Sequence, residues 1–125
     1  MRLNHECVRD FLLTLEGLTE NEYIDCNDHT EFESLQKYEK SDVVYTFQKL
    51  EEANYINAKV FKSLGGTSYN AMSITWDGHQ FLDNIRDNSV WSGTKDKVFS
   101  AVSSVSLPIL AEVAGSYIKS KLGLS

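Results

Sequence analysis

Cysteine, proline and positive charge are all scarce in this sequence of 125 residues, and each shortage excludes a class of protein. The two cysteines, Cys7 and Cys26, are too few for a disulfide scaffold and suit a reducing compartment. Lysine and arginine number 12 against 18 aspartate and glutamate residues, whereas nucleic-acid binders usually present a basic surface. The first residues, MRLNHECVRD, lack the apolar core of a signal peptide. We therefore expect a cytoplasmic, acidic domain with an ordinary hydrophobic core.

The best-defined pattern lies between Ser41 and Arg86 and predicts a helix, a hairpin and a second helix. Ser41 is a suitable N-cap, and apolar residues then recur at helical spacing at Val43, Val44, Phe47 and Leu50. Tyr55–Lys62 and Tyr69–Thr75 alternate like strands, and Gly65-Gly66 supplies the turn between them. Thr75 is a candidate cap for the last helix, whose apolar residues are Phe81, Leu82 and Ile85.

The chain before this pattern predicts two more helices and a short strand. Asn4 is a suitable N-cap for a first helix that ends near Gly17. Residues 23–26 fit a short strand, and Thr30 with Glu33 fits a capping box for a brief second helix that runs to about Tyr38. The sequence therefore predicts an α+β, mostly helical fold. We expect this fold to be a winged helix-turn-helix with a two-stranded wing over residues 1–88, followed by a helical C-terminal extension over residues 89–125.

In a winged helix the third helix and the wing contact the partner. The predicted exposed face of the third helix consists of Asp42, Tyr45, Thr46, Lys49 and Glu52. Between Asp42 and Ala53 there are three acidic residues and one lysine, a net charge of −2 that phosphates would repel. The wing offers Lys59 and Lys62, with Tyr69 expected at its tip, and Lys37 and Lys40 precede the helix. The wing lysines are either DNA contacts or ordinary solvated charges.

Few residues suggest a chemical site. His5, Cys7, Cys26 and His29 are four residue types that bind zinc, although their spacing is not that of a zinc finger. We favour a structural role for all four residues, and we expect neither a bound metal nor a cofactor. Cys7 with His79 lacks a recognisable oxyanion hole, and Gly65-Gly66 lacks the lysine of a phosphate-binding loop. We therefore expect no enzymatic activity.

The C-terminal segment is long and weakly charged. Residues 98–118 carry one charge, Glu112, but serines and Pro108 interrupt the apolar pattern. Pro108 should divide the segment into one helix from about Thr94 and another from about Leu107 to Leu122. The second helix has a broad apolar stripe that must be covered. We expect the stripe to pack on its own domain or on a second subunit in a homo-oligomer, and less readily on a membrane surface. Its residues are Leu110, Val113, Ala114, Tyr117 and Ile118.

Two segments resemble the signature motifs of an uncharacterised family of small proteins from bacteriophages, prophages and their bacterial hosts. These segments are Asn4-His5-Glu6-Cys7-Val8-Arg9-Asp10 and Thr75-Trp76-Asp77-Gly78-His79-Gln80-Phe81-Leu82-Asp83-Asn84-Ile85-Arg86-Asp87. The resemblance implies a phage or prophage origin and a winged-helix fold, but no reaction. Typical members have glycine after the third helix, where this chain has Asn54, a residue that also tolerates the left-handed conformation.

Three functions follow from these patterns, in order of preference. The first is binding of a basic protein partner, such as a host nuclease, polymerase or immune complex, because the third helix is acidic. The second is a dimeric DNA-binding transcriptional regulator, which is suggested by the fold alone. The third is a small membrane-associated protein that acts through its C-terminal helix.

Overall fold

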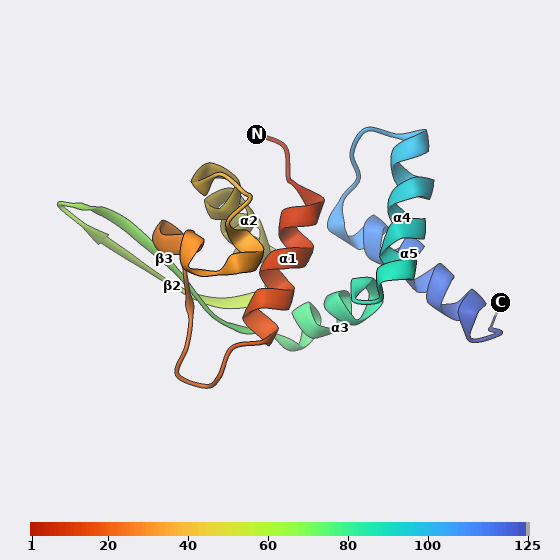
Figure 1. Cartoon of the computed structure of the whole chain (residues 1–125), viewed down its shortest axis with the longest axis horizontal. Coiled ribbons are helices and arrows are strands. Elements are labelled where there is room, and N and C mark those ends of the chain that lie inside the picture. Colours follow the sequence, from red (N-terminus) through yellow and green to blue (C-terminus); the bar gives the residue numbers. More distant parts are fainter. Residues whose placement is uncertain (125) are drawn as a thin grey trace. The chain divides into compact units, whose positions relative to one another are not determined.

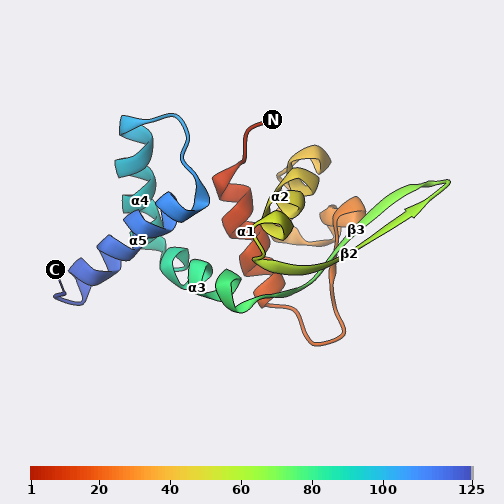
Figure 2. The same ribbon diagram turned by 180° about the vertical axis from the view of Figure 1, so that it is seen from behind.

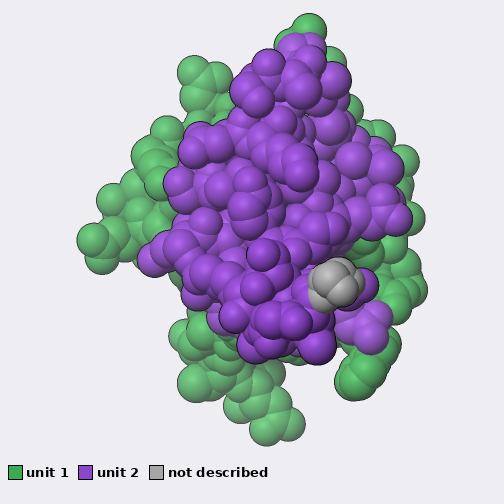
Figure 3. Space-filling view, turned by 90° about the vertical axis from the view of Figure 1, so that its right-hand side faces the viewer, with its two compact units in different colours: residues 1–79 green, residues 80–125 purple. Residues whose placement is uncertain are grey.

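The computed structural model describes residues 1–124, and the chain forms two compact units, Met1–His79 and Gln80–Ser125. Figure 3 colours the two units separately. The first combines helices with a small antiparallel sheet, and the second is helical. The fold is therefore α+β and mostly helical, as the sequence predicts.

The first unit begins with α1 (His5–Glu16), which lies where the sequence predicts it. The Asn4 side chain caps the helix by accepting a hydrogen bond from the Cys7 backbone N–H at 3.1 Å. The face toward the core is fully or almost fully buried because its apolar residues recur every three or four positions. These residues are Cys7, Val8, Phe11, Leu12 and Leu15.

The sheet has three antiparallel strands in the order β1-β3-β2. The strands are β1 (Ile24–Asp25), β2 (Ile56–Ser63) and β3 (Gly66–Ile74). Gly66 has a φ of 127°, so glycine is required at this end of the tight turn. The hairpin of β2 and β3, which we call the wing, extends well beyond α1 and α2, as both views show (Figures 1 and 2). Its distal half is therefore exposed on both faces.

The predicted second helix is wrong. Residues 26–35 form two short 3-10 helices, η1 (Cys26–Glu31) and η2 (Glu33–Leu35), rather than an α-helix from Thr30 to Tyr38. Asp25 caps the first by accepting a hydrogen bond from the Asn27 N–H at 2.9 Å. Phe32 is extended, with φ −103° and ψ 117°, so the capping box across it cannot form.

The third predicted helix is present as α2 (Lys40–Glu52), but its start differs from the prediction. Glu39 occupies the N-cap position without a side-chain hydrogen bond, and Ser41 lies inside the helix. The predicted core residues Val43, Phe47 and Leu50 are buried. Asn54 follows the helix with a φ of 61°, which confirms that this position is left-handed.

The segment from Thr75 to Gly78 holds the wing against the start of α3 (Trp76–Ile85). The Thr75 hydroxyl donates to the Asn54 carbonyl at 2.6 Å and accepts from the Gly78 N–H at 3.1 Å, which confirms the predicted cap. A Cβ on Gly78 would lie 2.1 Å from the Tyr55 carbonyl oxygen, so only glycine fits. The predicted apolar residues Phe81, Leu82 and Ile85 are buried.

The second unit contains α4 (Asn88–Ala101) and α5 (Leu107–Lys121), which pack against each other. Helix α4 begins six residues before the predicted Thr94, because the Asp87 carboxylate accepts a hydrogen bond from the Val90 N–H at 3.0 Å and caps it there. Residues 102–106 interrupt the tail, and Pro108 lies in the first turn of α5, where its missing N–H costs nothing. Among residues 1–124, every helix is too short or too polar to cross a bilayer.

Candidate macromolecular interface

The outer face of α2 differs from the predicted one at Thr46. This side chain is 0% exposed, so the prediction that it faces outward is wrong. It lies one helical turn after Val43 and beside Phe47 on the buried stripe. Its hydroxyl has no oxygen or nitrogen partner within residues 1–124, and the Cys7 thiol beside it is only a weak hydrogen-bonding group. Thr46 is therefore a core residue.

The remaining predicted residues of α2 are half-buried or exposed. Lys49 Nζ lies 3.0 Å from Glu52 Oε2 and 5.4 Å from the centre of the Tyr45 ring, and the hydrogen bond to Glu52 raises the pKa of Lys49. Because the helix begins at Lys40, it carries two lysines and three acidic residues, a net charge of −1. The acidic residues Glu51 and Glu52 are both exposed at its C-terminal end. This helix face therefore offers little uncompensated positive charge.

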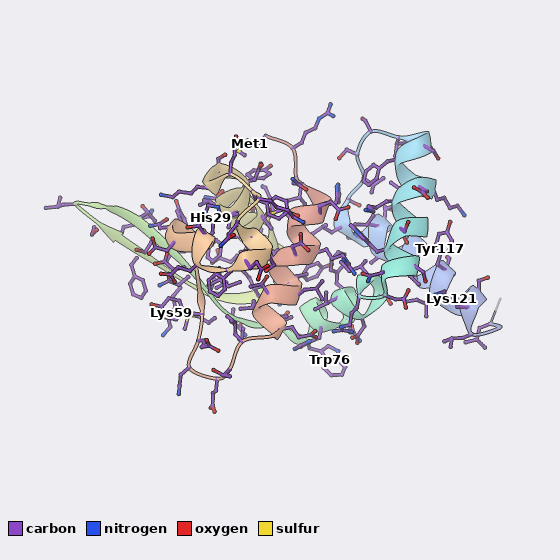
Figure 4. The ribbon with its side chains drawn as sticks, viewed as in Figure 1. Met1, His29, Lys59, Trp76, Tyr117 and Lys121 are labelled. Carbon is purple, nitrogen blue, oxygen red and sulfur yellow. The ribbon has the colours of Figure 1, made fainter. Side chains whose placement is uncertain are left out.

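The wing has a different character. Lys59 and Lys62 are exposed, and within residues 1–124 neither lies within ion-pair distance of a carboxylate. Lys59 lies in the middle of β2, where it pairs with Asn70 of β3 (Figure 4). Apolar side chains are exposed beside them, Val60 at 41%, Phe61 at 56% and Leu64 at 111%. A hairpin that keeps large apolar side chains in water is suited to bind a surface that covers them.

Tyr69 does not lie at the tip of the wing. The turn is at Leu64-Gly65, whereas Tyr69 pairs with Val60 in mid-strand. Its ring packs edge-on against Phe47 of α2, with the ring centres 5.6 Å apart. The prediction of an exposed tip residue is therefore wrong, because the aromatic ring anchors the wing to the core.

Lys37, which precedes α2, is also compensated. Its Nζ lies 3.1 Å from Asp10 Oδ2 and 5.3 Å from the centre of the Tyr38 ring. The Tyr38 hydroxyl donates to the same carboxylate at 2.5 Å. Burial, and then this hydrogen bond, raise the pKa of Tyr38 well above its usual range. Asp10 thus connects α1 to the segment before α2.

The candidate zinc ligands are buried side chains of the first unit. His29 is buried with its Nε2 2.8 Å from the Tyr38 carbonyl oxygen. Burial raises the pKa of the Cys7 thiol to about 11 and that of Cys26 to about 12, so both are inert at neutral pH. In the chain up to residue 124, no group of three or more His, Cys, Asp and Glu side chains is arranged to hold a metal ion.

Trp76 is an exposed aromatic residue that the sequence patterns do not predict as a binding residue. Its side chain is 76% exposed and points away from the start of α3 (Figure 4). Nearby in the first unit, a groove of about 280 Å³ is bordered by α1, β3 and His79. Its apolar lining comes from Leu15, Leu18, Met72 and Ile74. Trp76 lies between a helix cap and a required glycine and belongs to no apolar stripe, so periodicity does not point to it.

The predicted oligomerisation stripe of α5 is mostly used inside the second unit. Leu110 and Ala114 are 0% exposed, and Val113, Tyr117 and Ile118 are half-buried. A Cβ on Gly93 of α4 would lie 3.1 Å from the Tyr117 ring, so the two helices approach closely here. Figure 4 labels Tyr117 on α5.

These observations describe a small α+β protein with an exposed wing and without a metal centre among residues 1–124. Residues 2–104 match the family described as "Hypothetical protein (DUF2513)", and the chain belongs to this family. It is also 31% identical over 122 residues to an uncharacterized protein of Haemophilus influenzae (strain KW20 / Rd), covering 98% of this chain and 99% of the relative. No solved structure matches the chain.

Proposed function

We propose that the first unit is a winged helix that binds a protein partner through the outer face of α2 and the wing. The order α1, β1, α2, wing and α3 supports this, as does a sheet in which β1 lies beside β3. Two 3-10 helices take the place of the usual second helix. We further propose a phage or prophage origin, on the resemblance of the two signature segments, and action without catalysis in the bacterial cytoplasm.

The observation that carries this proposal is the composition of the exposed surface. The wing presents Phe61 and Leu64 to solvent, and the C-terminal end of α2 presents Glu51 and Glu52. Apolar side chains surrounded by charge are typical of protein interfaces, whereas DNA-binding surfaces are mainly basic. The first unit as a whole has seven lysine and arginine residues against fourteen acidic ones, a net charge of −7. A partner with a basic patch beside an apolar groove would complement this surface.

Affinity capture from host lysate tests the proposal. We expect a protein that is retained by the native chain and lost by two variants, Phe61→Ser with Leu64→Ser on the wing and Glu51→Gln with Glu52→Gln on α2. Glu31→Gln with Glu33→Gln removes the same charge from another exposed segment and is the matched control. Retention of the same proteins by all variants would exclude this surface.

DNA binding is the second candidate, and Lys59 and Lys62 favour it, since both are exposed and neither forms an ion pair within residues 1–124. No acidic residue lies on the wing between residues 56 and 74, so phosphates could approach it. If DNA is the partner, retention on a duplex falls steeply with added salt and is lost in Lys59→Glu with Lys62→Glu. Arg2→Glu with Lys97→Glu makes the same change in charge at residues that are not part of the wing. Absence of duplex binding by the native chain at low salt would exclude this function.

A further inference from the structure

Helix α5 keeps a second face that its own unit covers only in part, with Asn84 of α3 at one border. Pro108, Ala111 and Gly115 lie along this face, and with their neighbours they line a groove of about 650 Å³. A Cβ on Gly115 would meet nothing within 4 Å, so space is open at the centre of the helix. This face is distinct from the stripe of Leu110 and Ala114 that packs inside the unit.

Two opposite charges border the groove. Glu112 is the only acidic residue of α5, and Lys119 lies seven residues later on the same side of the helix. Neither side chain forms an ion pair within residues 1–124. Lys121, by contrast, lies 3.4 Å from the Asp87 carboxylate. Large apolar residues are also exposed at both ends of the helix, Ile109 at 46% and Leu122 at 68%.

These four residues are arranged symmetrically about the middle of the helix. Glu112 and Lys119 are equally distant in sequence from the Gly115–Ser116 pair, and so are Ile109 and Leu122. If a second copy of α5 lies antiparallel with a two-fold axis at this pair, each Glu112 faces Lys119 of the other copy. Each Ile109 then faces Leu122, and the small residues at the centre allow the helices to approach closely.

We propose that the open face of α5 docks against the same face of a second copy of this chain, antiparallel and two-fold symmetric. The charge pattern selects this occupant because the face is complementary to itself in one orientation. A parallel pair would place like charges opposite each other. One helix face per subunit buries less area than a standard interface, so the dimer forms in a concentration-dependent way. The proposal holds whichever macromolecule the first unit binds.

Charge exchange between copies tests both the surface and its orientation. We expect sedimentation velocity of the full chain at low salt to show a dimer whose fraction rises with concentration. Glu112→Lys and Lys119→Glu should each raise the dimer dissociation constant by about tenfold, because each substitution turns two attractive pairs into repulsive ones. An equimolar mixture of the two variants should restore the dimer, and so should the double variant.

Controls on α4 match these substitutions in charge. Asp96→Lys and Lys97→Glu alter exposed residues outside the groove and should leave the dissociation constant unchanged. Circular dichroism and the emission of the buried Trp91 verify that each variant is folded. A native chain that stays monomeric at every concentration would overturn the proposal. An equal rise of the dissociation constant in the control variants would overturn it too. So would a mixture of Glu112→Lys and Lys119→Glu chains that stays monomeric.

Discussion

The two units of this chain differ in net charge and in the elements that expose apolar side chains. The first carries a net charge of −7 and presents a wing, whereas the second has five basic and four acidic residues, a net charge of +1. In the first, Val60, Phe61 and Leu64 are exposed on a hairpin that extends away from its core, and Trp76 is exposed at the start of α3. In the second, Ile109 is exposed on α5, whose other face is already packed, and Phe99 is exposed on α4. This difference supports the proposals that the first unit selects the partner and that the second unit associates with a second copy.

The units also differ in the kind of contact that an added methyl group would meet at a glycine. Gly78 of the first unit lies against a backbone carbonyl that cannot move, whereas Gly93 of the second lies against the ring of Tyr117. Backbone contacts are rigid, and side-chain contacts can adjust by rotation. A substitution of Gly78 should therefore lower the stability of the first unit more than a substitution of Gly93 lowers that of the second.

The largest effect is expected for Gly78→Ala. The added methyl group would lie 2.1 Å from the Tyr55 carbonyl oxygen and would force the wing and α3 apart. We expect a loss of about 3 kcal/mol in unfolding free energy, measured by urea denaturation. Gly17→Ala is the control in the same unit, because its new methyl group meets only ordinary contacts at 3.6 Å and beyond. If both variants lost the same stability, the close contact at Gly78 would not be the cause.

The second effect is a loss of stability in alkali that originates in the first unit. Burial keeps the pKa of Cys7 at about 11 and that of Cys26 at about 12, whereas the unfolded thiols ionise near 9.0. The thiols' contribution is therefore complete below pH 9 and is lost as the pH rises through the folded pKa values. We expect roughly 2 kcal/mol less stability at pH 10 than at pH 8.

Urea denaturation between pH 7 and about pH 10 measures this loss. Cys7→Ala with Cys26→Ala should reduce the slope, although the raised pKa values of Tyr38 and Tyr55 leave part of it. An unchanged slope in the double variant would show that the thiols do not titrate on unfolding. The comparison uses slopes, because the substitution also creates cavities that lower stability at every pH.

A gain of stability is expected for Thr46→Val in the first unit. The buried hydroxyl lacks an oxygen or nitrogen partner within residues 1–124, and valine has nearly the same shape. We expect an increase of about 1 kcal/mol in unfolding free energy. The variant also tests Thr46 as a binding residue, because a buried core role predicts no change in partner or duplex retention. Lower stability would show that the thiol contact satisfies the hydroxyl.

A smaller effect is expected for Gly93→Ala in the second unit. The new methyl group would lie 3.1 Å from the Tyr117 ring, which must shift slightly, while alanine favours the helix by roughly 1 kcal/mol. The two effects oppose each other, so we expect a net change below about 1 kcal/mol. In a Trp76→Phe background, emission from Trp91 during denaturation follows this unit, since Trp91 is then the only tryptophan. A loss as large as that of Gly78→Ala would erase the contrast between the units.

The smallest expected effect is a loss of stability at low pH, and it originates in the second unit. Hydrogen bonds from Ser89 and from the Val90 N–H, with Lys121 nearby, hold the pKa of Asp87 well below its usual value. The contribution of Asp87 is complete above pH 4 and is lost as the pH falls through the lowered folded pKa. Asp87→Ala should therefore be less stable than the native chain at neutral pH, and the difference should shrink in acid. A difference that is constant with pH would assign the effect to helix packing.

Local patterns predicted most of the elements correctly. Asn4 and Thr75 cap the helices that they precede, Asn54 is left-handed, and Gly66 turns the hairpin. These features depend on residues within a few positions of one another. The prediction of a second α-helix is wrong because Phe32 is extended in the folded chain. The residues of the capping box do not determine the backbone conformation of Phe32.

The candidate surface was only partly predictable. The wing lysines were identified, but Thr46 and Tyr69 were assigned to the wrong environments. Helical spacing places Thr46 near the edge of the apolar stripe, and Cys7 of α1 is one of the side chains beside it in the folded chain. Tyr69 alternates correctly along its strand, but its exposure depends on how far the wing extends beyond Phe47. Trp76 belongs to no apolar stripe, so periodicity does not point to it, and only its exposure in the folded chain suggests a role in binding.

The sequence by itself determined the acidic charge, the positions of the caps and turns, and the apolar stripes of the helices, because these properties depend on residue type and short spacing. Only the tertiary structure decided which stripe is covered and which remains open. In the folded chain, Leu110 and Ala114 of α5 are buried within the second unit, whereas a Cβ on Gly115 would meet nothing within 4 Å. The physical reason is that burial is a property of two surfaces, and a periodic pattern describes only one of them.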